Sequence, residues 1–178
     1  MSTETRRDFE IESARRAGKD RPSSRIDYSK LIIVPDPDTA EWWAGTREHK
    51  YLVRQCAECG HKWFPPLPAC SNCTSMKLDW FETRGTGIIY GYAVVTQPIL
   101  AAFTAAVPYI IGLIDLDDCL DIRGVPVRVK GIVLNTEDEV GIGLPVRAVF
   151  ESTDDPNIVV PHWTVSGDRP GCWRFAEK

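Results

Sequence analysis

The sequence reads Cys56-Ala57-Glu58-Cys59-Gly60 and, ten residues later, Cys70-Ser71-Asn72-Cys73, and this stretch decides the fold. The two-residue gap within each Cys-x-x-Cys pair lets both thiolates reach one ion, and backbone N–H groups in the tight turn stabilise their charge. Four thiolates favour zinc, with iron as the competing metal. A closed four-thiolate shell leaves no position for water, so the sequence predicts a structural zinc ribbon with Cys56, Cys59, Cys70 and Cys73 as ligands.

Two disulfides, or four unconnected buried thiols, are the alternatives to a metal site. A reducing cytoplasm argues against the disulfides. Gly60 follows Cys59 at a position that often needs a positive φ, whereas Thr74 occupies the equivalent place after Cys73 and fits it less comfortably. His61 adjoins a shell that four sulfurs already complete, so we expect it on the surface or in support of a ligand.

Composition places the chain among soluble globular proteins. Of its 178 residues, 43% are hydrophobic and 26% are charged, which excludes wholesale disorder and collagen-like structure. The longest apolar runs, 99–106 and 110–114, fall short of the roughly 18–20 residues that a membrane-spanning helix needs. The polar first residues carry no secretory pattern, so we expect a cytoplasmic protein with no membrane partner.

The chain divides into five segments around the cysteines. Residues 1–35 form a polar extension that we expect to be partly ordered, and residues 36–50 a helix, capped by Asp38 or Thr39, whose Trp42 and Trp43 pack on the ribbon. Residues 51–82 form the ribbon, residues 83–165 a second, all-β unit, and residues 166–178 a C-terminal tail. The predicted fold class is mainly β, with an N-terminal helix and a rubredoxin-like ribbon.

Five strands are predicted in the second unit, at 87–96, 109–116, 125–133, 145–151 and 158–164. They are rich in Val, Ile and Tyr and are separated by Gly, Pro and Asp clusters, as is typical of strands. Five short strands within about 80 residues suit a small closed barrel of the OB type. A two-sheet sandwich is the alternative, although five strands are few for it.

An apolar connection joins the first two barrel strands. Residues 98–108 carry no charge, although loops are normally polar and run over the surface. One reading is a helical turn that caps the barrel core. The other is an exposed surface for a partner or an acyl chain, to which Ile99, Leu100, Phe103, Val107 and Tyr109 would contribute.

No nucleophile with a neighbouring base is visible in the sequence. Cys119 lies among Asp115, Asp117, Asp118 and Asp121, whose charges would raise its pKa, and Cys172 has no identifiable base. The aspartates do not have the spacing of an EF-hand, so we expect a solvated acidic turn there.

The arrangement of ribbon and barrel resembles a known family. The chain resembles the zinc-ribbon/OB-fold proteins first grouped as domain of unknown function 35, which are associated with acyl-CoA metabolism. The matching segments span about residues 40–165. They include Glu41-Trp42-Trp43, the two Cys pairs, Trp63-Phe64-Pro65-Pro66, Gly85-Thr86-Gly87-Ile88-Ile89-Tyr90, Val107-Pro108-Tyr109, Ile111-Gly112-Leu113-Ile114-Asp115-Leu116 and Gly141-Ile142-Gly143-Leu144-Pro145-Val146. The first 30 residues and those after Thr164 do not align.

The resemblance implies an accessory subunit without catalytic residues of its own. Such proteins bind a thiolase-superfamily enzyme that makes or cleaves carbon–carbon bonds of acyl-CoA thioesters, such as a thiolase or a steroid or aromatic side-chain aldolase. The barrel would bind CoA or close the partner's active site, and a hetero-tetramer would follow from a dimeric partner. Arg128 and Lys130 are candidates for the CoA phosphates because arginine suits phosphate; ordinary outward-facing strand residues are the alternative.

Two other functions remain open on the sequence. Zinc ribbons and OB barrels also bind single-stranded nucleic acid, with Tyr90, Tyr92 and Tyr109 as possible stacking residues. Residues 81–178 carry eight basic and thirteen acidic side chains, however, which argues against a nucleic-acid partner. An independent thioesterase or acyltransferase using Cys119 or Cys172 is the third hypothesis, and it lacks an adjacent base.

Overall fold

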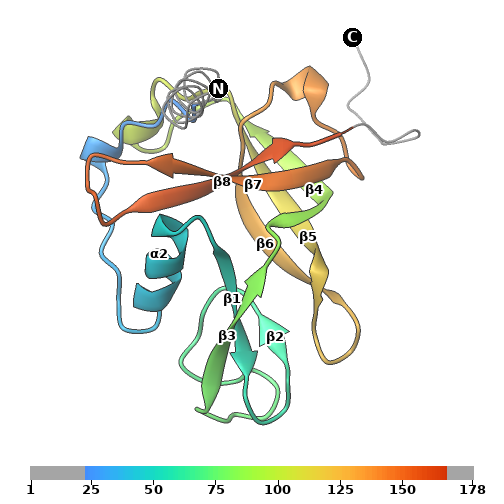
Figure 1. Cartoon of the computed structure of the whole chain (residues 1–178). Coiled ribbons are helices and arrows are strands. Elements are labelled where there is room, and N and C mark those ends of the chain that lie inside the picture. Colours follow the sequence, from blue (N-terminus) through green and yellow to red (C-terminus); the bar gives the residue numbers. More distant parts are fainter. Residues whose placement is uncertain (1–22, 168–178) are drawn as a thin grey trace, which may run out of the picture.

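The computed structural model describes residues 23–167, and Figure 1 shows a small sheet below a barrel. Helix α2 spans Ala40–Arg47. The lower sheet comprises β1 (Tyr51–Cys56), β2 (Lys62–Trp63) and β3 (Leu78–Thr83). The barrel comprises β4 (Thr86–Val95), β5 (Tyr109–Leu120), β6 (Pro126–Val133), β7 (Pro145–Ser152) and β8 (Val159–Val165). The described residues also form three 3-10 turns, η1 (Tyr28–Lys30), η2 (Ala101–Phe103) and η3 (Glu137–Glu139). The mainly β prediction with an N-terminal helix is confirmed.

Helix α2 is shorter than the predicted 36–50 and lies on the lower sheet. Asp36 Oδ1 accepts hydrogen bonds from the backbone N–H and the hydroxyl of Thr39, both at 2.8 Å, and this turn fixes where the helix begins. The Trp42 ring lies 6.3 Å from the Tyr51 ring and 5.9 Å from the Phe64 ring, centroid to centroid. The helix is therefore held by aromatic packing against the first ribbon strand.

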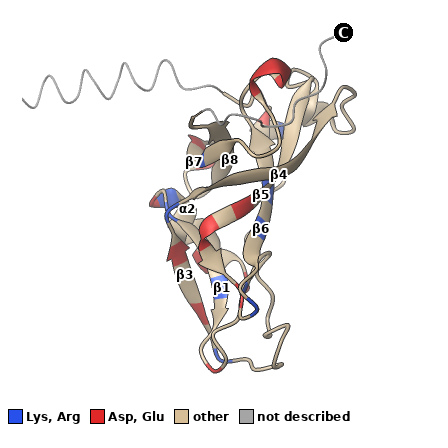
Figure 2. Cartoon of the chain, turned by 90° about the vertical axis from the view of Figure 1, so that its right-hand side faces the viewer, with Lys and Arg blue, Asp and Glu red and all other residues tan. Residues whose placement is uncertain are grey.

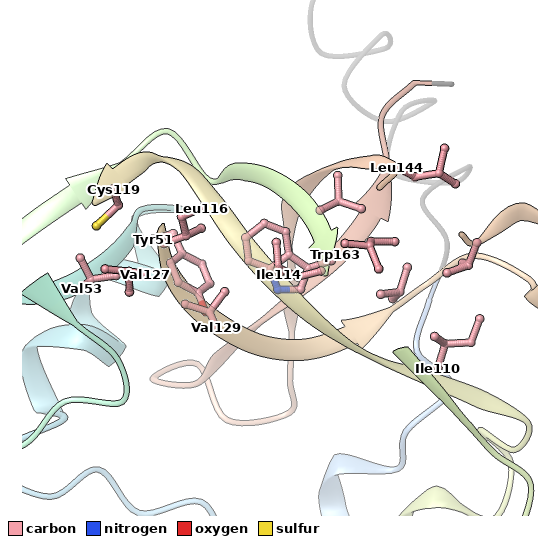
Figure 3. Close-up of a cluster of buried hydrophobic side chains, with 14 residues drawn as sticks. Tyr51, Val53, Ile110, Ile114, Leu116, Cys119, Val127, Val129, Leu144 and Trp163 are labelled. Atoms are coloured by element: carbon pink, nitrogen blue, oxygen red, sulfur yellow. The ribbon is translucent and has the colours of Figure 1, made fainter. Parts of the chain in front are cut away.

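The lower sheet is antiparallel in the order β2-β1-β3, and one of its faces enters the barrel core. Tyr51 and Val53 of β1 are fully buried together with barrel residues. The Tyr51 and Trp163 rings lie 5.3 Å apart (Figure 3). Ribbon and barrel thus share one hydrophobic core, because alternate residues of β1 face the barrel.

The barrel closes in the order β4-β5-β6-β8-β7. Its neighbours are antiparallel except β6 and β8, which run parallel where Val133 pairs with Trp163. This is the five-stranded Greek-key arrangement of an OB fold, as predicted. A Cβ on Gly131 would lie 2.8 Å from the Trp163 ring, so glycine is required where that indole crosses β6.

The acidic run is not the solvated turn that the sequence predicts. Strand β5 continues through it to Leu120. Arg128 on β6 binds the Asp115 carboxylate at 2.7 and 3.0 Å, and Arg84 lies within 3.4 Å of Asp117 and Asp118. The prediction was wrong because arginines on β6 and in the β3–β4 connection balance the carboxylates and allow the strand to continue.

The polar segment 23–34 before α2 packs on the barrel. Residues 1–22 and 168–178, which hold most of the predicted extension, most of the tail and Cys172, lie outside the described part of the chain. Within residues 23–167, no helix is long and apolar enough to cross a membrane.

Candidate functional site

Four thiols converge at the tip of the ribbon. The sulfurs of Cys56, Cys59, Cys70 and Cys73 all lie within 4.8 Å of one another. The Cys56 and Cys73 sulfurs are 3.6 Å apart, and those of Cys59 and Cys70 are 3.7 Å apart. A tetrahedron of Zn–S bonds of about 2.3 Å has edges of about 3.8 Å, and these two sulfur pairs lie close to that separation, so the cluster suits a tetrahedral zinc ion.

The two knuckles that present these thiols have the same backbone. Gly60 N–H donates to Cys56 O and Thr74 N–H donates to Cys70 O, each at 2.9 Å. Gly60 has φ +73° and Thr74 has φ +63°. Both positions after the Cys pairs therefore need a left-handed conformation, which Thr74 adopts against its preference.

The pKa values of two of the thiols diverge when no cation is present. A hydrogen bond from the Cys59 backbone N–H lowers the pKa of Cys56 to about 7. The Ser75 backbone N–H also acts to lower the pKa of Cys73, but neighbouring thiols and burial raise that pKa to about 12. Four thiolates in this space need a cation, which is the charge that zinc would supply.

His61 lies beside the metal site and outside its ligand set. Its Nε2 is 3.1 Å from the Ser71 hydroxyl, and its ring stacks on Trp63 with centroids 5.6 Å apart. Asn72 donates its side-chain N–H to the Cys59 sulfur at 3.7 Å. His61 therefore stabilises the ribbon by packing, and the predicted four-Cys shell needs no fifth ligand.

The apolar connection between β4 and β5 is buried on one side and exposed on the other. It forms the 3-10 turn η2, and Ala102 and Ala106 are buried against the protein. Ile99 is 91% exposed and Leu100 is 53% exposed. Phe103 and Val107 are half-buried, and the Phe103 ring packs on Tyr109 with centroids 5.2 Å apart. One side of the loop is thus anchored, and its tip presents two large aliphatic side chains to solvent.

The two candidates for binding CoA phosphates differ in their surroundings. The Arg128 guanidinium is held by both oxygens of Asp115 and lies 3.2 Å from the centroid of the Tyr90 ring. Lys130 is exposed on the same outward face of β6. Arg128 already has a carboxylate partner, so Lys130 is the cation more accessible to a phosphate.

The structure does not favour Cys119 as a nucleophile. Cys119 is fully buried, and burial raises the pKa of its thiol to about 11. A thiol of this kind is inert, because the nucleophile is the exposed thiolate.

Figure 2 shows lysines and arginines interspersed with acidic residues along the strands, without a basic stripe of the kind that tracks a nucleic-acid backbone. The charge distribution over residues 23–167 therefore gives the nucleic-acid hypothesis no specific support.

A buried polar cluster is present that the sequence analysis missed. Ser24, Tyr28, Glu151 and His162 meet between the N-terminal segment and strands β7 and β8. Ser24 and Glu151 are 127 positions apart in the chain, and no local motif relates them. Only the barrel topology, which pairs β7 with β8, could have placed Glu151 beside His162.

Comparison with known families identifies both parts of the structure. Residues 43–79 match the family described as "ChsH2, rubredoxin-like zinc ribbon domain". Residues 80–151 match that described as "ChsH2, C-terminal OB-fold domain". The boundary between the two families falls within β3, which leads from the ribbon to the barrel.

Individual relatives agree with this result. The chain is 30% identical over 145 residues to the probable enoyl-CoA hydratase alpha subunit of Thermomonospora curvata, covering 79% of this chain and 43% of the relative. It is 28% identical to the 3-oxo-4,17-pregnadiene-20-carboxyl-CoA hydratase alpha subunit of Mycobacterium tuberculosis, covering 75% of this chain and 38% of the relative. The chain thus spans less than half the length of these two curated relatives.

A solved structure matches over nearly its whole length. A chain of the Ltp2-ChsH2(DUF35) aldolase superposes with a TM-score of 0.64 at 27% identity, covering 75% of this chain and 98% of that chain. The described fold therefore corresponds to nearly the whole of that solved chain.

Proposed function

Because this chain belongs to the DUF35 family of zinc-ribbon and OB-fold proteins that includes ChsH2, we propose that it is an accessory subunit of an acyl-CoA-transforming complex. The catalytic residues lie on the partner, and this chain docks on it. We further propose that the partner is a thiolase-superfamily enzyme that makes or cleaves a carbon–carbon bond of an acyl-CoA thioester, in a hetero-tetramer.

The names of the relatives support an acyl-CoA complex, but they do not agree on the reaction that the complex catalyses. Two are named as alpha subunits of acyl-CoA hydratases, and one structure is named as an aldolase with Ltp2 and ChsH2 as its components. The hydratase relatives match this chain over less than half of their length, so their chemistry is not carried over. The aldolase chain matches over 98% of its length, which favours carbon–carbon bond chemistry in the partner.

The observation that carries the proposal is the exposed tip of the apolar loop. Two adjacent large aliphatic side chains, Ile99 at 91% and Leu100 at 53% exposure, stand on a loop whose alanines are buried. Burying such side chains on a partner is favourable by about 25 cal/mol per Å² of apolar surface. We assign Ile99 and Leu100 to the contact with the partner or the acyl chain, and Phe103, Val107 and Tyr109 to the support beneath them.

The CoA thioester is the proposed substrate of the complex. Its phosphates need cations at the subunit boundary, and Lys130 is exposed on the outward face of β6 without competition from a paired carboxylate. Arg128 contributes its bidentate pair with Asp115 to the shape of this surface. The four-Cys site stabilises the ribbon and takes no part in the reaction, because its shell is closed.

Purification of the tagged full chain from its native host tests the proposal. We expect a larger thiolase-like chain to elute with it in a fixed ratio, identified by mass spectrometry. Ile99→Asp should reduce the partner recovered at least about tenfold, because a buried carboxylate without a cation is strongly disfavoured. Ile122→Asp is the matched control, since Ile122 is exposed in the turn between β5 and β6 at the opposite end of the barrel (Figure 1).

The proposal is wrong if the wild-type chain elutes alone. If both variants lose the partner equally, or if neither variant loses it, the contact with the partner does not involve the apolar loop. Circular dichroism of each variant checks that the barrel is folded.

A further inference from the structure

A segment ahead of α2, residues 23–34, crosses from the β7–β8 hairpin to the apolar loop, and we call it the strap. At the hairpin it is tied to one carboxylate. Glu151 Oε1 accepts hydrogen bonds from the Ser23 hydroxyl at 2.8 Å and the Ser24 N–H at 3.2 Å. Glu151 Oε2 accepts from the Ser24 hydroxyl at 2.5 Å and the Tyr28 hydroxyl at 2.9 Å. His162 Nε2 lies 3.0 Å from the same oxygen.

The same strap also holds the apolar loop. Asp27 N–H donates to Ala102 O at 2.9 Å, and the Arg25 guanidinium donates to Ala106 O at 3.1 Å. Both alanines are 1% exposed. These two bonds fix the inner side of the loop at two carbonyls, one in η2 and one just after it.

The backbone between the two attachments is bent unfavourably. Arg25 has φ +58°, a left-handed conformation that is unfavourable for a residue other than glycine. Ser24, which binds Glu151, comes just before this bend, and Asp27, which binds the loop, comes two residues after it. Such a conformation persists only where its surroundings impose it, and the bonds on either side of Arg25 do so.

We propose that the strap is a latch that sets the conformation of the apolar loop, and that Glu151 is the residue that fastens it. Release of the strap from Glu151 removes the two hydrogen bonds to the loop and frees residues 98–108 from the barrel. The role of the loop as a partner contact rests on the proposed function, whereas the coupling between Glu151 and the loop is a property of this chain alone.

The pKa values in the cluster indicate that Glu151 is an ionised carboxylate that accepts the hydrogen bonds of the strap. Burial acts to raise the pKa of Glu151, but the hydrogen bonds from His162, Ser24, Ser23 and Tyr28 lower it to about 2. Burial raises the pKa of Tyr28 above its usual range, so the phenol remains a donor. The ionised carboxylate is therefore the acceptor for every donor that the strap and β8 present to it. Glu151→Gln would replace one of its two accepting oxygens by an NH₂ group and leave at least two donors unpaired.

Hydrogen exchange of the full, zinc-loaded chain tests the latch without any partner. In Glu151→Gln, the amides between residues 99 and 107 should exchange about 5- to 30-fold faster than in the wild type, which corresponds to about 1–2 kcal/mol. Glu41→Gln is the matched control on the exposed side of α2, and it should leave loop exchange unchanged.

A double variant on the strap, Ser24→Ala with Tyr28→Phe, leaves β7 and β8 intact and should accelerate the loop in the same way. The latch is refuted if the strap exchanges faster in these variants while residues 99–107 keep the wild-type rate. Partner recovery is measured separately with Ile99→Asp. Faster loop exchange in Glu151→Gln together with unchanged partner recovery in Ile99→Asp would leave the latch standing and remove the loop from the partner contact.

Discussion

At the scale of single residues, the two Cys-x-x-Cys knuckles of the ribbon differ in backbone strain. Gly60 and Thr74 adopt the same left-handed backbone after their Cys pairs. A Cβ on Gly60 would meet nothing within 4 Å, so substitutions there act through backbone conformation alone. The identical turns therefore allow a direct comparison of glycine with a branched residue.

Thr74→Gly should stabilise the zinc-loaded protein by about 1 kcal/mol, because it removes left-handed strain. The lost bond from its hydroxyl to Cys73 O offsets part of the gain. Gly60→Ala should destabilise the protein by about the same amount. Thermal unfolding of both variants checks the pair, and a Thr74→Gly protein that is less stable than the wild type would contradict this account of the knuckles.

The same scale shows what the sequence can and cannot reveal about single positions. Gly60 and Thr74 were predictable because a Cys-x-x-Cys turn prescribes the backbone of the next residue. Glu151 was not, because its partners Ser23, Ser24 and Tyr28 lie more than 120 positions away. A lone glutamate at a strand end gives no signal until the topology brings its donors together.

At the scale of elements, closure of the barrel depends on the close approach of β8 to β6. The single pairing of β6 with β8 joins Val133 to Trp163, and the fully buried Trp163 indole lies over Gly131. A side chain at this glycine would separate the two strands where no other ladder pair holds them.

Gly131→Ala should therefore destabilise the protein by about 1–3 kcal/mol through overpacking. Gly91→Ala is its control, because Gly91 is also in a barrel strand and an added Cβ there has no neighbour within 4 Å. Urea unfolding of the two variants measures whether the loss of stability is specific to Gly131. Equal stability losses would show that the contact between Gly131 and Trp163 does not limit closure.

The elements themselves were largely predictable, since alternation of Val and Ile with polar residues marks half-buried strands. The end of β5 was not. Aspartate is rare in strands, so the run from Asp115 to Asp121 reads as a turn. Its arginine partners are distant in sequence: Arg84 comes from the β3–β4 connection and Arg128 from β6. Which side of the apolar loop faces solvent was also undetermined, because both readings fit an uncharged sequence.

At the scale of the whole molecule, the ribbon and the barrel are one cooperative unit. Tyr51 and Val53 belong to a ribbon strand and are buried in the barrel core (Figure 3). Any loss of order in the ribbon therefore exposes barrel residues such as Trp163, which contacts Tyr51.

Removal of the metal should consequently destabilise the barrel as well as the ribbon. With free zinc at a thousand times its dissociation constant, the ion contributes about 4 kcal/mol, and a chelator should remove this stabilisation from the whole chain. Far-ultraviolet circular dichroism and tryptophan fluorescence should then report one transition at a lower temperature. A barrel that melts at the same temperature with and without the chelator would contradict the shared core.

The most direct measurement of the central claim is acyl-CoA turnover by the chain alone, by its co-purified partner alone, and by the two together. We predict no turnover by this chain, because the proposed catalytic residues lie on the partner, and full turnover only when both proteins are present. Sustained acyl-CoA turnover by the isolated chain would contradict the account and place the catalytic residues here.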